Sequence, residues 1–211
     1  MIVKSKKYLL LCIVWIFMAI QARCQSGENE ITLQQNWVPA LGNNFDKALF
    51  KTSLDISKHH LTGLIFFKQT SDTSFRIIFT NEIGMKFFDL EFVREKLIIQ
   101  YCFPSLSRKS LMKILESDFR LLLPEKFSGQ KKIILENENS GTKEYKVKTA
   151  SGKYYYTIDI PSHKIKHILS TGKLLGKTRI FFNDTEHPVP HKIHIENPTI
   201  KLIMKMTLLD N

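Results

Sequence analysis

Residues 61–103 carry four short apolar segments and read LTGLIFFKQTSDTSFRIIFTNEIGMKFFDLEFVREKLIIQYCF. Apolar side chains recur mostly at every second position, the period of a β-strand, within 61–67, 75–79, 85–92 and 97–103. The polar breaks between these segments are at most four residues long and lie at 71–73, 81–84 and 94–96. Such short connections join antiparallel neighbours, because a parallel crossover needs about a dozen residues or more. This stretch therefore predicts an antiparallel meander.

The strand period continues on both sides of this stretch. Upstream, Ala48, Phe50, Leu54 and Ile56 alternate with polar residues. Downstream, turn residues separate further expected strands at 131–135, 143–148, 153–160, 164–169, 177–182, 191–196 and 199–209. The chain therefore predicts eleven or twelve strands.

One helix is expected to interrupt the strands. Its apolar residues recur at three- and four-residue spacing and are Leu111, Ile114, Leu115, Phe119 and Leu122. Ser107 is the expected N-cap and Pro124 ends the pattern, so the helix spans about 107–122. A short segment at 37–45 is a second, N-terminal helix candidate.

Several predicted strands are apolar on both faces, most clearly 63–67, 76–79 and 86–90. A sheet of this kind must be covered on both sides or wrap around something apolar. One clear helix is too little cover for about eleven strands. We therefore expect a mainly β protein whose curved antiparallel sheet forms an unclosed half-barrel around an apolar cavity. An interior filled by the protein's own side chains remains the alternative.

The N-terminus has the pattern of an export signal. Three lysines within residues 1–7 precede thirteen uncharged residues, 8–20, and this length favours a signal over a membrane span, which needs about 20. An uncleaved anchor is the alternative. We expect residues 1–24 to be a signal peptide and residues 25–211 to be one half-barrel domain. Ala22 and Cys24 suit cleavage after Cys24, whereas acylation of Cys24 would make the chain a lipoprotein with a polar tether at 25–30.

Export changes the interpretation of the charge. The chain carries 31 basic and 20 acidic residues, a net +11, and a strong excess of this kind raises the question of nucleic acid or anionic membrane. Four of the basic residues lie in the signal, so the mature chain has +7 and meets little nucleic acid. The clustered cations Lys126, Lys131, Lys132, Lys143, Lys146, Lys148 and Lys153 indicate either protected strand edges or contact with anionic lipid headgroups.

The order of elements resembles the Lol-type periplasmic lipoprotein carriers and receptors of Gram-negative bacteria. The resemblance is carried by residues 61–68, by residues 75–89 and by Pro190-His191-Lys192-Ile193-His194-Ile195 leading into the last strand. It implies an unclosed barrel that shelters the acyl chains of lipoproteins between the two membranes. An acylated Cys24 would favour the anchored receptor type, on the periplasmic face of the outer membrane, and a cleaved signal would favour the soluble periplasmic carrier.

The leading hypothesis is a monomeric, non-enzymatic carrier or receptor whose partners are lipid or acylated lipoprotein, with membrane surface contact, no nucleic acid and no cofactor. Burial of an acyl chain releases about 0.8 kcal/mol per CH₂, so crossing an aqueous compartment requires an apolar cavity. The expected wall is Phe50, Leu54, Leu64, Phe66, Phe75, Ile77, Phe79, Phe88, Leu90, Phe92, Ile99, Tyr101, Phe103, Tyr154, Tyr156, Ile158, Met204 and Met206. The alternative function is a structural or partner-binding envelope lipoprotein with a packed interior and no lipid ligand.

Other groups of residues give weaker indications of a catalytic or metal site. His187, His191 and His194 are three imidazoles within eight residues, but Pro188 and Pro190 break the regular spacing that a metal site needs. Asp89 and Glu91 share a strand face, where we expect a solvated pair rather than an acid–base pair. We expect Cys102, the one thiol of the mature chain if Cys24 is lost or acylated, to be a small buried apolar side chain. No catalytic or metal site is therefore predicted.

Overall fold

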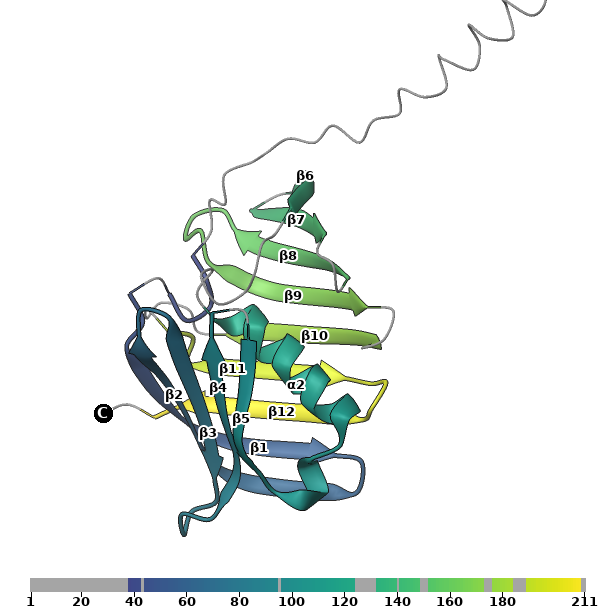
Figure 1. The fold of residues 1–211 in the computed structure, drawn as a ribbon. Coiled ribbons are helices and arrows are strands. Elements are labelled where there is room, and N and C mark those ends of the chain that lie inside the picture. The colour runs from purple at the N-terminus through teal and green to yellow at the C-terminus, as the bar shows by residue number, and fades with distance from the viewer. Residues whose placement is uncertain are drawn as a thin grey trace, which may run out of the picture. The chain divides into compact units, whose positions relative to one another are not determined.

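A computed structural model of the chain describes residues 38–42, 44–94, 96–123, 132–139, 141–148, 152–172, 176–183 and 189–209. The expected signal at 1–24 and the acylation candidate Cys24 lie outside these residues. The described chain forms twelve strands and one α-helix (Figure 1). The strands are β1 (Lys47–Ile56), β2 (His59–Ser71), β3 (Ser74–Thr80), β4 (Lys86–Val93), β5 (Lys96–Cys102), β6 (Lys132–Asn139), β7 (Thr142–Lys148), β8 (Lys153–Asp159), β9 (Ile165–Gly172), β10 (Gly176–Asn183), β11 (Lys192–Asn197) and β12 (Leu202–Leu208). The helix is α2 (Lys109–Leu122), preceded by the 3₁₀ turn η2 (Pro104–Leu106).

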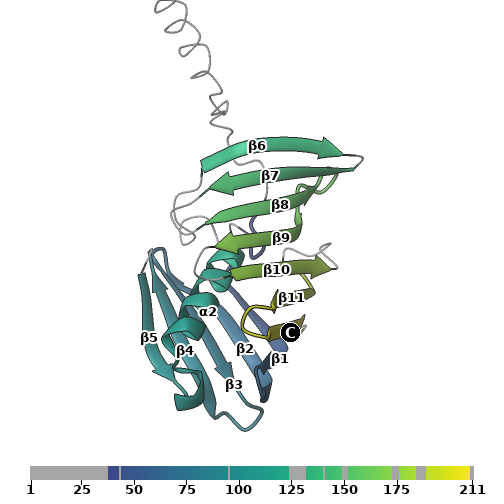
Figure 2. The same ribbon diagram turned by 90° about the vertical axis from the view of Figure 1, so that its right-hand side faces the viewer.

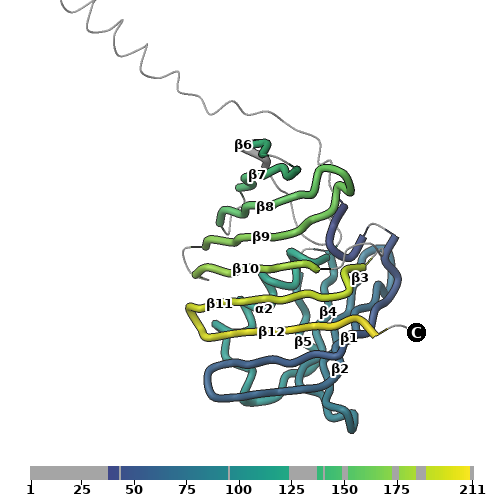
Figure 3. The backbone as a smooth tube through the Cα atoms, turned by 180° about the vertical axis from the view of Figure 1, so that it is seen from behind, coloured from purple at the N-terminus to yellow at the C-terminus, as the bar shows by residue number. Residues whose placement is uncertain are grey.

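All twelve strands belong to one antiparallel sheet, in the order β5-β4-β3-β2-β1-β12-β11-β10-β9-β8-β7-β6. The first and last strands pair in the middle of this sheet, where Leu54 lies opposite Met204 (Figure 3). Two meanders extend outward from that pair and end at β5 and β6, which do not pair with each other. The prediction of a mainly β, unclosed antiparallel sheet with one clear helix is confirmed, and the described chain has twelve strands.

Burial alternates along the strands and identifies the inner face of the sheet. In β1 the buried positions are Ala48, Phe50, Thr52, Leu54 and Ile56. The sheet curves around α2, which lies against this buried face (Figure 2). We call it the inner face and the opposite one the outer face.

The helix begins two residues later than the sequence predicts. Arg108 is its N-cap and makes no side-chain capping bond. The hydroxyl of Ser107 donates instead to the carbonyl of Pro104, 2.8 Å away, and closes the preceding 3₁₀ turn. The expected N-terminal helix at 37–45 is also wrong for its described part. Val38 forms a parallel bridge with Lys164 there, and turns follow.

Gly63 allows β2 and β3 to approach closely. A Cβ atom at this position would lie 1.9 Å from the carbonyl oxygen of Thr80 and 2.8 Å from the Cα of Asn81. Both neighbours are backbone atoms, which cannot rotate away as a side chain does. Glycine is therefore required at this close approach of β2 to β3.

Candidate functional site

Most of the predicted wall residues lie together on the inner face and are buried. They are Phe50, Leu54, Phe75, Ile77, Phe79, Phe88, Leu90, Phe92, Tyr154, Tyr156, Ile158, Met204 and Met206. One apolar row crosses six neighbouring strands from β8 to β1 and consists of Tyr156, Ile168, Ile180, Ile195, Met204 and Leu54. The inner face is thus a continuous apolar surface.

Five predicted wall residues are not part of this buried surface. Leu64 and Phe66 lie half-buried on the outer face, because Gly63, Ile65 and Phe67 take the inner positions of β2. The difference is one residue of register, which exchanges the two faces of a strand.

The other three belong to the edge strand and its end. Ile99 lies opposite Leu90 but is 48% exposed, because no strand pairs with the far side of β5 in the described sheet. Tyr101 is 42% exposed and lies opposite Asp89 after a shift of register. Phe103 is half-buried beyond the end of β5.

The helix fills the inner face in front of β2 to β4. The ring centroid of Phe119 lies 6.0 Å from that of Phe67 and 5.8 Å from that of Phe88. The guanidinium carbon of Arg120 lies 5.0 Å above the ring centroid of Phe92. Because these rings are fully buried, a ligand reaches this part of the inner face only when α2 moves away from it.

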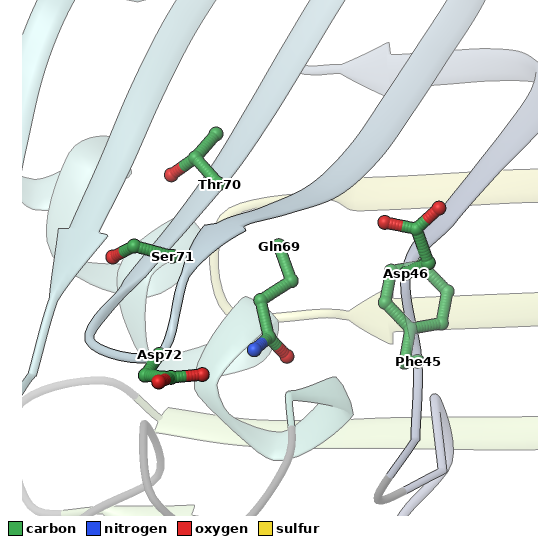
Figure 4. A pocket seen from close by; sticks show the side chains of 6 residues that line it. All are labelled: Phe45, Asp46, Gln69, Thr70, Ser71 and Asp72. Carbon is green, nitrogen blue, oxygen red and sulfur yellow. The ribbon is translucent and has the colours of Figure 1, made fainter.

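A recess of about 400 Å³ lies elsewhere, where the chain enters β1 and where β2 turns into β3 (Figure 4). Its lining is Phe45, Asp46, Gln69, Thr70, Ser71 and Asp72. All but Phe45 are polar, and none was predicted as a wall residue. This open, polar recess does not match an acyl-chain cavity.

A buried polar group interrupts the apolar contact between α2 and the sheet. Asp118 is 2% exposed on the helix, and the hydroxyl of Thr178 in β10 donates a hydrogen bond to its carboxylate. The side-chain amide of Asn197 donates in turn to Thr178 Oγ1 at 2.9 Å. Burial raises the pKa of Asp118 from 3.8 to about 7, and the Thr178 hydrogen bond opposes part of that rise.

The predicted solvated pair on β4 is wrong for Asp89, which is 1% exposed. Arg76 on β3 donates two hydrogen bonds to the Asp89 carboxylate, at 2.8 and 2.9 Å, and Lys86 donates a third at 2.8 Å. The hydrogen bond from Arg76 lowers the pKa of Asp89, against the opposing effect of burial. This carboxylate holds β3 and β4 together and is not placed for acid–base chemistry.

The histidines and the thiol do not form a reactive centre among the described residues. No group of three or more His, Cys, Asp or Glu residues there could hold a metal ion, and His187 lies outside that part of the chain. The side chain of His194 packs near Phe181, with ring centroids 6.1 Å apart. Cys102 lies half-buried with its Sγ 3.6 Å from Met112 Sδ, and burial raises its pKa, which disfavours the nucleophilic thiolate.

The β3–β4 hairpin presents an apolar tip that the sequence analysis did not single out. Ile83 is 90% exposed and Met85 is 46% exposed. The side chain of Asn81 accepts hydrogen bonds from the backbone N–H groups of both residues, at 3.2 and 2.8 Å. The turn is therefore ordered around an isoleucine that faces solvent.

Part of the predicted lysine cluster comes together across neighbouring strands. Lys148 of β7 lies opposite Lys153 of β8 and, on its other side, opposite Lys132 of β6 in the backbone register. Lys126 and Lys131 lie outside the described residues. No helix of the described chain is long and apolar enough to cross a membrane.

Comparison with known proteins identifies the fold. A LolA superfamily protein from Nitrosomonas europaea superposes with a TM-score of 0.52 over 83% of this chain and 87% of its own, at 11% identity. The chain has a LolA-like fold. A domain assigned to an outer membrane lipoprotein-sorting protein of Vibrio parahaemolyticus gives a TM-score of 0.46 over 78% of this chain and 83% of its own, at 10% identity. No family model and no curated protein matches the sequence.

The LolA-like fold confirms the architecture implied by the sequence resemblance. At 11% identity the similarity concerns the fold alone and transfers no individual residue.

Proposed function

We propose that the chain is a non-enzymatic carrier or receptor, exported to the periplasm, that shelters lipid or lipoprotein acyl chains against the inner face of its LolA-like sheet. The observation that carries the proposal is the continuous apolar row across β8 to β1 on the inner face, next to the part of that face that α2 fills. An acyl chain of about fourteen CH₂ groups, at about 0.8 kcal/mol each, releases about 11 kcal/mol, which is of the same order as the burial of the apolar side chains that α2 places against the sheet.

In this proposal α2 acts as a plug that the acyl chain replaces. The rings of Phe67 and Phe88, which now contact Phe119, would contact the acyl chain instead. Exchange of one apolar partner for another keeps the inner face out of water in both states. The packed arrangement is then the ligand-free form of the same protein.

Contact with a membrane surface is proposed for the β3–β4 hairpin. Burial of one large aliphatic side chain contributes about 1.5–3 kcal/mol in full and less at a bilayer surface. We expect Ile83→Ser to weaken binding to vesicles of phosphatidylethanolamine and phosphatidylglycerol by about tenfold, as about 1.4 kcal/mol implies. Ile203→Ser, at an exposed position of β12, is the matched control and should leave vesicle binding unchanged.

A thiol lock tests whether ligand uptake needs movement of α2. Met112→Cys introduces a second thiol at the helix position whose native Sδ lies 3.6 Å from Cys102 Sγ, with the new sulfur one bond nearer the backbone. After oxidation, confirmed by loss of free thiol, we expect uptake of a fluorescent fatty acid to fall to background and to return when a reductant is added. Equal uptake by the oxidised and reduced forms would refute the plug role of α2, and no uptake by either form or by the native chain would refute the carrier function.

The second candidate function is a structural or partner-binding envelope protein with a packed interior. The complete burial of Phe67, Phe88 and Phe119 in the present arrangement favours it. Recovery of one stoichiometric protein partner without lipid would support this candidate. The intact mass of the mature protein separates the anchored form, with acylated Cys24, from a soluble form that begins at Gln25.

A further inference from the structure

Asp118 is an acidic residue on the apolar face of α2. It lies three residues after Leu115 and four before Leu122, both of which are buried. Its carboxylate accepts from the Thr178 hydroxyl, which accepts from the Asn197 amide, whose Oδ1 accepts from the backbone N–H of Thr199 at 3.1 Å. Oδ2 of Asp118 is buried and has no hydrogen-bond partner among the described residues.

The charged groups near Asp118 are directed elsewhere. On α2 itself, Arg120 donates to Glu116 at 2.8 Å and covers the ring of Phe92 on the side of β4. On β10, Arg179 belongs to the outer face, since Thr178 and Ile180 occupy the inner positions. None of these groups is a cause of the shift in the pKa of Asp118, which comes from burial and Thr178 alone.

Among the described residues, the phenols of Tyr145 on β7 and of Tyr154 and Tyr156 on β8 are titratable groups on the same inner face. All three are buried. Burial raises the pKa of Tyr156, which therefore stays neutral wherever Asp118 titrates. The carboxyl of Asp118 is thus the group whose charge changes at this contact near neutral pH.

Ionisation of Asp118 opposes the docking of α2. A carboxylate that is buried among apolar side chains, with one oxygen lacking a hydrogen-bond partner, carries a large desolvation penalty. Protonation removes that penalty. When α2 leaves the sheet, water solvates both oxygens and the penalty disappears.

We propose that Asp118 is a proton-operated latch that holds α2 on the inner face when protonated and favours its release when ionised. The consequence for the ligand rests on the proposed function: acyl chains would enter the inner face more readily at alkaline than at acidic pH. The latch itself is a property of the ligand-free protein.

The sign and the size of the effect follow from the two states of the carboxyl. In the docked state the pKa of Asp118 is about 7, and in the released state it returns towards 3.8. The docked state therefore binds more protons between about pH 4 and pH 7, so release becomes more favourable as the pH rises through that range and constant above it. The equilibrium constant for release should rise by at most about 100-fold between pH 5 and pH 8.

Hydrogen–deuterium exchange of the full mature chain without lipid measures this equilibrium. The observable is the protection of the α2 amides at pH 5 and pH 8, corrected for the intrinsic exchange rate. We expect protection in the native chain to fall by up to about 100-fold from pH 5 to pH 8. Protection in Asp118→Asn should stay constant over the same interval. Glu116→Gln, on the same helix but outside the buried contact, is the matched control and should keep the native pH dependence.

Thr178→Val distinguishes a latch from a merely structural contact. Because the Thr178 hydroxyl stabilises the ionised carboxylate, its removal should raise the pKa of docked Asp118, so the pH-dependent rise in release should continue to higher pH and reach a larger total change. Protection that is independent of pH in the native chain, or the same pH dependence in Asp118→Asn, would overturn the latch. Failure of lipid uptake together with the expected exchange pattern would overturn the proposed function and leave the latch intact.

Discussion

The substitution Asp118→Asn should stabilise the protein in a pH-dependent way. An asparagine side chain copies the shape of the protonated carboxyl and can still accept from Thr178. It has no ionised form, so the desolvation penalty of a buried charge cannot arise. We expect the variant to match the native chain in acid and to exceed its stability at neutral and alkaline pH.

The size of the difference follows from the pKa of Asp118. A rise from 3.8 to about 7 corresponds to at most about 4 kcal/mol, at about 1.4 kcal/mol per pH unit. The folded state holds the proton more tightly, so native stability is highest below about pH 4, falls as the pH rises to about 7 and then stays level with respect to this group. The advantage of the variant should therefore grow from near zero at pH 4 to at most about 4 kcal/mol at pH 8.

Urea unfolding followed by circular dichroism measures this difference at each pH. Subtraction of the native curve from the Asp118→Asn curve cancels the titration of the other groups, which are the same in both proteins. A variant that is less stable than the native chain by a constant amount at every pH would refute the reasoning, because it would show that Asp118 is ionised and well paired in the folded state.

Three further predictions concern packing and pairing. Gly63→Ala should destabilise the fold by at least about 1–3 kcal/mol in thermal unfolding, because its Cβ would meet the backbone of Thr80; unchanged stability would show that β3 can move away. Phe119→Ala should cost about 3–5 kcal/mol in urea unfolding, since its ring packs on those of Phe67 and Phe88; a loss below about 1 kcal/mol would place α2 off the sheet in solution. Arg76→Met should destabilise the protein more at pH 7 than at pH 3. The pKa of Asp89 is lowered by Arg76, so their ion pair stabilises the fold above the ordinary pKa of an aspartate and this stabilisation is lost as the pH falls. An equal loss at both pH values would contradict the ion pair.

The architecture was predictable because it follows from local patterns. Apolar residues at every second position, separated by short polar breaks, predict antiparallel neighbouring strands. The spacing of Leu111, Leu115 and Leu122 predicts the helix. The face of β2 was not predictable, since Leu64 and Phe66 are as apolar as Ile65 and Phe67. The deciding residue is Gly63, whose inner position depends on the close approach of Thr80.

The sequence alone also could not predict which side chains lie next to each other on neighbouring strands. The burial of Asp89 depends on Arg76, which lies opposite Glu91 and therefore diagonally across from Asp89, two residues away on the same strand face. Only the β3–β4 register sets that arrangement. Asp118 left a clearer signal, because it interrupts the apolar stripe of the helix between Leu115 and Leu122. A charged residue at such a position is buried with a partner or has a functional role.

Native mass spectrometry of the protein purified from membranes tests the carrier function most directly. The account predicts a population heavier than the mature chain by the mass of bound lipid, which organic extraction removes and a fatty-acid probe replaces. A protein that runs at its bare mass and takes up no fatty-acid probe would contradict it.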